Sequence, residues 1–526
     1  MRKARIAITL LLVLAVSAGL VGCGGSPQAQ PKDTSKDKPA PKPTKSVVFA
    51  RASDSDNLDP VIQDGNPNIW IFNLVMEGLI RTTNDGKGIE PCLAEKWEFN
   101  QDKTALTFTL RKGVKFSDGT PVTVQDWVFS LDRARLTKES PWQFSLEAVK
   151  EVKALDADHL QIVLKSPWAP ILADLAMFNA TVTSEAYFKK VGLEGFSQKP
   201  LGTGPFYFVE WKKGEHISLK KNPNHWQKDV PLVDEIKFVV VPEDNTRIMQ
   251  LQGGTVDLID AVPWSRIDEI RKDPNLQMVL APSTSTTYLV LNNAREPFKK
   301  LKVRQALAYA TDRDALVKTV LFGNGKVAVS FRPPDGPMYN DKLQPKPYDP
   351  VKAKQLLAEA GYSKGFKTTI MINPATIANV QIATVLKEQW AKVGIELNII
   401  QYDGPTLSAK RRGSEYDVTT SGWTDDIVDP SQEAEYMCVS KTSKNFWTNW
   451  GNQEADGLAQ QAKSEMDTAK QQKIYDRIQE LVYNEVPLIP LYHTPYPVGM
   501  RKGITGFIQT PLGNYRFEKL DKASGK

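Results

Sequence analysis

The sequence predicts a mixed α/β protein with more than one domain. Segments in which apolar and polar residues alternate, typical of strands, are interspersed with segments whose apolar residues recur at helical spacing. In the second half of the chain the two kinds of segment alternate, as α/β domains require. The chain has 526 residues, and at about 100–200 residues per domain this length suggests two to four domains.

Two segments show the period of a half-buried strand. Apolar residues alternate with polar ones over 106–110 and again over 160–164. We predict a further strand over 395–400, and the apolar segment 487–492 follows the last predicted helix.

Helix starts and ends are marked by capping and breaking residues. Thr123 with Asp126 three residues later is a capping-box pattern, which predicts a helix directly after Thr123. Pro350 and Gly361 mark the start and the end of a second helix. Two more helices are predicted from apolar residues at helical spacing, and they cover 377–393 and 474–482.

The composition and the charge exclude several classes of protein. Hydrophobic residues make up 41% of the chain and charged residues 24%, which excludes a polytopic membrane protein, a collagen and a wholly disordered chain. The net charge is +6, of which residues 1–22 and residues 23–45 each supply half. The chain from Ser46 onward is therefore neutral and has no electrostatic footprint for nucleic acid.

The first residues predict export and attachment to a membrane. Residues 1–22 have the basic start and the apolar run of a signal peptide, and the run of 16 residues over 6–21 is shorter than the ~20 residues of a spanning helix. The sequence Leu20-Val21-Gly22-Cys23 resembles the bacterial lipobox, in which the signal is cut before the cysteine and lipid is attached to it. Cys23 is therefore the predicted lipid-attachment site. The alternative is a cleaved signal with an incidental cysteine.

Residues 23–45 predict a flexible tether. They are rich in Pro, Lys, Ser and Gly and contain no large apolar residue. We therefore expect an extracytoplasmic protein, lipid-anchored to the bacterial cell membrane at the cell surface or in the periplasm.

The sequence offers no convincing site for catalysis, metal binding or cofactor binding, since its GxGxxA match over 323–328 follows a predicted helix rather than a strand. The four histidines form no HExxH pattern, and no GxSxG nucleophile elbow exists. We therefore predict no enzyme, no cofactor and no metal site. Cys92 and Cys438 are either a disulfide pair or two buried thiols, and the sequence leaves both open.

Several blocks of the sequence, in a constant order, resemble one family. It is the peptide/nickel family of extracytoplasmic solute-binding proteins of ABC importers, which includes the dipeptide- and oligopeptide-binding lipoproteins. The resemblance covers the chain from Ser46 to the C-terminus. Its blocks include Leu93-Ala94-Glu95-Lys96-Trp97, Arg111-Lys112-Gly113-Val114-Lys115-Phe116-Ser117-Asp118-Gly119, Leu201-Gly202-Thr203-Gly204-Pro205-Phe206 and Gly422-Trp423-Thr424-Asp425-Asp426.

The resemblance implies the two-lobed periplasmic-binding-protein fold, with a hinge and an additional third domain on the first lobe. The implied first lobe is discontinuous and comprises 46–77, 195–291 and 487–526. The extra domain would be 78–194, and the opposing lobe 292–486.

The resemblance also implies ligand-binding residues. In peptide-binding members an extended peptide pairs with a protein strand, and 421–426 matches that strand. Asp426 matches the aspartate that pairs with the α-ammonium of the peptide, while a loop-capping aspartate is the alternative. Trp423 and Thr424 would line the cleft, although Trp423 fits a core position equally well.

Three further positions are implied outside that segment. Asp54 matches a ligand-facing strand of the first lobe, with an exposed loop aspartate as the alternative. Tyr288 is either an aromatic residue of the cleft or a core residue of its strand. Arg411 resembles an arginine that pairs with a ligand carboxylate, or is a solvated basic residue. The segment 372–375 lacks the arginine that dipeptide-binding members place there, which argues against strict dipeptide specificity.

The function implied is therefore that of a monomeric, lipid-anchored receptor that captures di- or oligopeptides between two lobes. It would deliver them to the permease of an ABC transporter for transmembrane transport. The alternative is the same scaffold with a non-peptide solute, such as a nickel chelate, glutathione, an opine or an oligosaccharide. An extracytoplasmic enzyme would need a nucleophile–base pair or a metal cluster, and the sequence offers neither.

Overall fold

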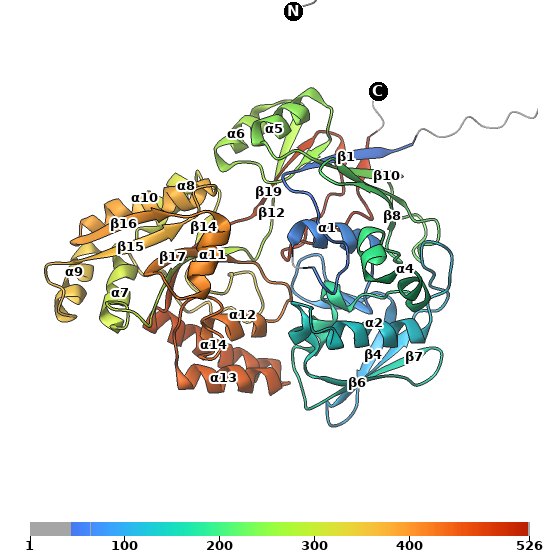
Figure 1. Ribbon diagram of the computed structural model, residues 1–526, viewed down its shortest axis with the longest axis horizontal. Helices are drawn as coiled ribbons and strands as arrows, with labels where there is room; N and C mark the ends of the chain where they lie inside the picture. The colour runs from blue at the N-terminus through green and yellow to red at the C-terminus, as the bar shows by residue number, and fades with distance from the viewer. Residues whose placement is uncertain (1–43, 64, 524–526) are drawn as a thin grey trace, which may run out of the picture. The chain divides into compact units, whose positions relative to one another are not determined.

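The structure is a computed structural model that describes residues 44–63 and 65–523. The predicted signal peptide, the lipid-attachment site Cys23 and tether residues 24–43 lie outside the described residues. The described chain forms sheets of seven, six and four strands and two small two-stranded sheets (Figure 1). Within these residues, no helix combines the length and the apolar character needed to cross a membrane.

The seven-stranded sheet has the order β12-β19-β11-β1-β10-β9-β8. Its strand β1 (Ser46–Arg51) is parallel to β10 and β11, and the other pairs are antiparallel. Val47 and Phe49 face one hydrophobic core and Ala50 faces another, as the period of two in a strand requires. The other strands are β8 (Phe206–Lys212), β9 (His216–Lys221), β10 (Glu235–Val240), β11 (Leu258–Ile259), β12 (Leu276–Ala281) and β19 (Tyr496–Arg501).

Helices pack on both faces of this sheet. Helix α1 (Asn66–Val75) contributes Ile69, Phe72 and Val75 to the core that contains Phe49. Helices α5 (Asp244–Gly253) and α6 (Ile267–Lys272), with the 3-10 turn η3 (Trp264–Arg266), cover the opposite face around Ala50.

The six-stranded sheet has the order β14-β18-β13-β17-β15-β16. Strand β15 runs parallel to both β16 and β17, and the remaining pairs are antiparallel. Its strands are β13 (Thr286–Leu291), β14 (Lys326–Val327), β15 (Phe366–Ile372), β16 (Ile395–Gln401), β17 (Val418–Trp423) and β18 (Leu488–His493).

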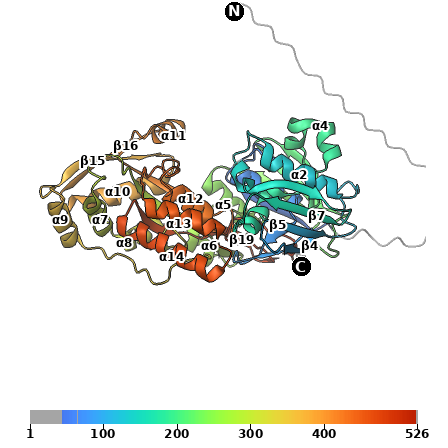
Figure 2. The same cartoon turned by 90° about the horizontal axis from the view of Figure 1, so that it is seen from below.

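The two faces of the six-stranded sheet carry different groups of helices (Figure 1 and Figure 2). On β13, Leu289 and Leu291 face one core, while Tyr288 and Val290 face the other. The first core is filled by α7 (Leu301–Ala310), α8 (Arg313–Val320), α9 (Pro350–Glu359) and α10 (Ile377–Ala391). The second is filled by α12 (Ser431–Cys438), α13 (Gln453–Ser464) and α14 (Thr468–Glu485). Helix α11 (Gly404–Arg412) packs against β15 through Leu407.

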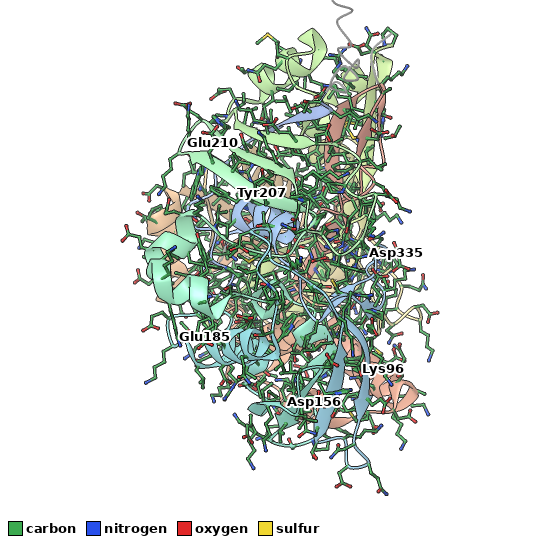
Figure 3. The ribbon with its side chains drawn as sticks, turned by 90° about the vertical axis from the view of Figure 1, so that its right-hand side faces the viewer. Lys96, Asp156, Glu185, Tyr207, Glu210 and Asp335 are labelled. Carbon is green, nitrogen blue, oxygen red and sulfur yellow. The ribbon has the colours of Figure 1, made fainter. Side chains whose placement is uncertain are left out.

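The four-stranded sheet is antiparallel, with the order β4-β5-β7-β6. The apolar side chains of β5 and β7 enter one core with helix α2, and polar residues such as Lys96 of β4 and Asp156 of the β6–β7 turn lie outside (Figure 3). The strands are β4 (Ala94–Phe99), β5 (Ala105–Leu110), β6 (Val149–Ala154) and β7 (His159–Leu164), and the helices near them are α2 (Val124–Leu136), η1 (Gln143–Leu146), α3 (Ile171–Leu175), η2 (Phe178–Ala180) and α4 (Glu185–Gln198). The small sheets pair β2 (Ile80–Thr82) with β3 (Ile89–Pro91) and β20 (Ile504–Thr505) with β21 (Asp521–Lys522).

The strand and helix predictions are confirmed. The segments 106–110 and 160–164 are β5 and β7, and their apolar residues are buried. Thr123 accepts a hydrogen bond from the amide of Asp126, whose carboxylate accepts one from the amide of Thr123, so the capping box is complete. The helices predicted over 377–393 and 474–482 are α10 and α14.

The chain crosses between the seven-stranded and six-stranded sheets at two places. Strand β12 is followed by β13, and β18 is followed by β19, with only a few residues between them. Both β13 and β18 pair in the six-stranded sheet, with strands of the expected opposing lobe. We therefore propose that the lobe boundaries lie at 282–285 and 494–495, a few residues from the expected 291 and 487.

The two cysteines of the described chain do not form a disulfide. Cys92 and Cys438 are both free and buried, and they belong to different hydrophobic cores. The open choice between a bridge and two thiols is thus decided in favour of buried thiols.

Candidate functional site

The end of β17 has one hydrogen-bonding edge without a strand partner. Strand β17 pairs with β13 along its whole length, from Val418 to Trp423. On its other side, β15 pairs only with Val418 and Thr419. Among the described strands, none covers this edge from Thr420 to Trp423. An uncovered strand edge can add an extended ligand through main-chain hydrogen bonds, so this edge is the first part of the candidate site.

The first of two neighbouring aspartates after β17 is satisfied by protein groups. Arg332 Nη1 donates to Asp425 Oδ2 at 3.0 Å, and Trp423 Nε1 donates to Asp425 Oδ1 at 3.0 Å. The Asp425 amide in turn donates to Thr284 Oγ1 at 2.9 Å. These bonds hold the segment after β17 against the crossing between β12 and β13.

Arg332 also binds a second carboxylate. Its Nη1 donates to Glu433 Oε2 at 2.8 Å, and all three side chains of this Arg332 cluster (Arg332, Asp425 and Glu433) are buried. Because one guanidinium faces two acids, burial and the neighbouring Asp425 raise the pKa of Glu433. Burial likewise raises the pKa of Asp425. The cluster therefore has no positive charge to spare for a third carboxylate.

Asp426 is that third carboxylate. Its charge is stabilised by the Gln432 side chain and, within the described residues, by no cation. Burial, followed by the charge of Asp425, raises the pKa of Asp426 to about 7. Asp426 is partly exposed, and a partly buried carboxylate without a cation carries a desolvation cost that a ligand ammonium would offset. Asp426 is therefore suited to bind an amine.

Trp423 and Thr424 lie between the strand edge and Asp426. The Trp423 ring is partly buried, with its centroid 5.4 Å from that of Tyr436 and 5.9 Å from that of Phe446. Thr424 is partly exposed. One part of the Trp423 surface thus packs in a core, and the rest is accessible.

Tyr288 lies behind this segment and is completely buried. Its hydroxyl donates to Phe331 O at 2.8 Å and to Glu433 Oε1 at 3.2 Å. Tyr288 therefore supports the Arg332 cluster from the core of the six-stranded sheet.

Arg411, on α11, reaches the edge of β17. Its Nη2 donates to Thr420 O at 2.6 Å and to Thr419 Oγ1 at 2.8 Å, and its guanidinium carbon lies 5.0 Å from the centre of the Trp447 ring. Arg411 thus covers one carbonyl of the otherwise uncovered edge.

Asp54 lies in the part of the chain that forms the seven-stranded sheet, three residues after the end of β1. Its Oδ2 accepts from the Gly214 amide at 2.7 Å and from Trp211 Nε1 at 3.2 Å, and its Oδ1 accepts from the Ser55 amide at 2.8 Å. These contacts attach the end of β1 to the β8–β9 hairpin. The hairpin contains Tyr207 and Glu210, which Figure 3 shows on strand β8.

A cavity of about 290 Å³ is lined by Ile427, which follows Asp426 in the sequence, and by Gln432, whose side chain stabilises the charge of Asp426. We call it the acidic cavity. One wall comes from the segment that holds the four-stranded sheet and the other from α12 and α13. Its lining includes Phe144, Trp168, Asp174 and Met177 on the first wall and Ile427, Gln432, Glu435, Tyr436 and Lys463 on the second. The rings of Phe144 and Tyr436 meet across it, with centroids 6.1 Å apart.

Sequence reasoning missed Arg332, Glu433, Gln432 and Asp174. Arg332 is 93 residues from Asp425 and belongs to no motif, so no local pattern indicates their contact. Glu433 and Gln432 lie on α12, and only their closeness to the 421–426 block is a signal. Among the described residues, no group of three or more His, Cys, Asp or Glu side chains could hold a metal ion.

We predict that Arg332→Met destabilises the protein by about 3–5 kcal/mol, because it leaves two buried carboxylates without a cation. Urea unfolding at pH 7.5 measures the loss. Arg477→Met is the matched control, since Arg477 is an exposed partner of Glu454 and should cost less than about 1 kcal/mol. Equal effects of the two substitutions would contradict the importance of the Arg332 cluster.

Comparison with known proteins identifies the fold and the family. Residues 88–445 match the family "Bacterial extracellular solute-binding proteins, family 5 Middle". The chain is 31% identical to heme-binding protein A of Haemophilus influenzae, covering 96% of this chain and 97% of that protein. It is 30% identical to the dipeptide-binding protein of Escherichia coli, covering 90% and 94%.

A solved structure agrees with these relatives. The ABC transporter-associated periplasmic binding protein DppA of Helicobacter pylori, in complex with the peptide STSA, superposes with a TM-score of 0.78 at 27% identity, covering 91% of this chain and 98% of that chain. The resemblance and the two-lobed fold expected from the sequence are thus confirmed. The chain belongs to family 5 of the bacterial extracellular solute-binding proteins, which bind solutes and are not enzymes.

Proposed function

We propose that this protein captures peptides, of two or more residues, and delivers them to an ABC importer. Two features close together in the chain support this most. One is the edge of β17 that no described strand covers, and the other is the carboxylate of Asp426, which no cation of the described residues stabilises. The edge offers main-chain groups to a peptide backbone, and Asp426 offers a charge partner to its α-ammonium. Affinity from these two elements does not depend on the peptide's side chains.

The relatives support the same ligand class. The Escherichia coli relative is named for dipeptide binding, and the Helicobacter pylori structure holds a peptide. We also propose that Trp423 and Thr424 line the peptide channel, and that Asp54 and Tyr288 act from behind it by holding its walls.

Asp426→Asn should raise the dissociation constant for a tripeptide at least tenfold at pH 7.5, a loss of about 1.4 kcal/mol, because the amide lacks the charge that pairs with the ammonium. Wild-type binding should also weaken about tenfold from pH 7.5 to pH 5.5. A carboxyl with a pKa of about 7 is mostly ionised at the higher pH and protonated at the lower one. The ligand ammonium, with an ordinary pKa of about 8, is mostly charged at both pH values. Isothermal titration calorimetry measures both effects.

Asp335→Asn, on an exposed loop, is the matched control and should bind like the wild type (Figure 3). The N-acetylated tripeptide lacks the ammonium and should bind weakly at every pH. Unchanged affinity of Asp426→Asn would exclude the amine-pairing role.

For the other end of the peptide we propose Arg411. Its Nε and Nη2 bind Thr419 and Thr420, whereas its Nη1 has no hydrogen-bond partner among the described residues and could face a carboxylate. The wild type should prefer a tripeptide acid over its amide about fivefold, as expected for one exposed charge pair of about 1 kcal/mol. Arg411→Met should lose that preference, while Arg412→Met, next to it on α11, should keep it. Equal acid-to-amide ratios in all three proteins would contradict this assignment.

A non-peptide solute is the second candidate. The segment 372–375 has no arginine for a dipeptide carboxylate, and the Haemophilus influenzae relative is named for heme binding. Native mass spectrometry of the tether-free protein distinguishes the candidates. Several adducts with peptide masses support the peptide receptor, and a single non-peptide adduct supports the alternative. The same spectrum shows whether the protein is the monomer that we propose.

We further propose that the mature protein is a lipoprotein anchored through Cys23 to the cell membrane. The support is the sequence alone, from the apolar run to the Leu20-Val21-Gly22-Cys23 motif. Cys23→Ser should move the full-length protein from the membrane pellet to the soluble extracytoplasmic fraction, as immunoblots of the two fractions would show. Continued recovery of the variant as cleaved protein in the pellet would contradict lipid anchoring.

A further inference from the structure

The acidic cavity contains hydrogen-bond acceptors that lack donors. Gln432 is 7% exposed, and its Oε1 has no hydrogen-bond partner in the described chain. Asp174 is 5% exposed, and its carboxylate accepts from Trp168 Nε1 at 2.8 Å but from no other side chain among the described residues. Buried acceptors of this kind are normally satisfied, so the cavity is suited to an occupant that donates N–H bonds.

The cations of the cavity do not supply those donors. Lys463 Nζ binds Glu435 Oε2 at 2.6 Å and lies 5.4 Å from the centre of the Trp168 ring. The other lining lysine, Lys441, is exposed. The lining acids are Glu147, Asp174 and Glu435, so the acids outnumber the two lining lysines. The cavity therefore favours a positively charged occupant.

The walls of the cavity are apolar. Phe144, Trp168, Met177 and Tyr436 provide aromatic and thioether surface on both sides. Such surface accommodates the methylene stem of a long side chain, and aromatic faces attract a cation. An occupant with an apolar stem and a cationic, N–H-donating end matches these apolar walls and the acceptors of Gln432 and Asp174.

We infer that the acidic cavity selects ligands with a second basic group, held one side chain away from the amine that binds Asp426. The substrate class is peptides with an N-terminal lysine or arginine, or diamines of similar length. Asp174 is the specificity-determining residue, and Gln432 positions both the cavity occupant and Asp426. This inference rests on the proposed function, because it assumes that the ligand amine lies at Asp426.

The state of Asp174 in the empty cavity supports the inference. Burial, together with Asp429 and Glu147, holds the pKa of Asp174 well above its usual range, against the opposing effects of Trp168 and Lys463. A cation that enters the cavity would offset the effect of burial and lower the pKa of this carboxyl. Binding of a basic side chain should therefore release a proton to the solvent.

The experiment compares Lys-Ala-Ala with norleucyl-Ala-Ala, which differs in lacking the side-chain ammonium. Calorimetry at pH 7.5 should show at least tenfold tighter binding of the lysine peptide. Titrations in buffers of different ionisation enthalpy should show that this peptide releases more protons. Asp174→Asn keeps an acceptor for Trp168, and it should reduce the preference to less than threefold and abolish the extra proton release.

Asp156→Asn is the matched control, because Asp156 is an exposed aspartate of the β6–β7 turn (Figure 3), and it should keep the preference. If Asp174→Asn fails to fold, Glu147→Gln at the exposed rim should still reduce the preference severalfold. Equal or tighter wild-type binding of the norleucine peptide would overturn this inference while leaving the proposed function intact. Binding of neither peptide would overturn both.

Discussion

The geometry of the site depends on one buried guanidinium. Arg332 binds Asp425 and Glu433 with the same nitrogen, Glu433 accepts the Tyr288 hydroxyl, and Asp425 accepts the Trp423 indole N–H. These bonds connect β13, the end of β17 and the start of α12. Buried ion pairs contribute little net stability, because desolvation offsets their attraction, but their geometry is demanding. Here the cluster holds the segment from Trp423 to Asp426 in one conformation.

In this arrangement the residues that hold the segment after β17 in place are not the residues that we propose bind the ligand. The charge of Arg332 is used on the two carboxylates behind the segment, and no other cation of the described residues stabilises Asp426. Among the described strands, β15 pairs only with Val418 and Thr419 of β17, so beyond Thr419 no strand covers this edge. In the function that we propose, main-chain groups and one carboxylate recognise what all peptides share, whereas the acidic cavity discriminates among their side chains. General affinity and selectivity would then come from different residues of the same site.

The local elements followed from the sequence because short-range physics determines them. Alternation over 106–110 became β5, and Thr123 with Asp126 became a complete capping box at the start of α2. The family was also evident from blocks such as 421–426, which match it in order. The lobe boundaries were expected at 291 and 487, a few residues from the points where the chain passes from one sheet to the other. The sequence of β13 and β18 shows that they are apolar segments, but it does not show to which sheet they belong.

The sequence by itself determined the elements, the family and the two neighbouring aspartates after β17. Only the tertiary structure decided that Asp425 is bound by Arg332, that no cation of the described chain binds Asp426, and that Asp174 faces the cavity lined by Gln432. The physical reason is that periodicity and capping act over a few residues. A buried charge is instead paired with whichever side chain the fold brings near. For Asp425 that side chain is Arg332, which is 93 residues away in the sequence.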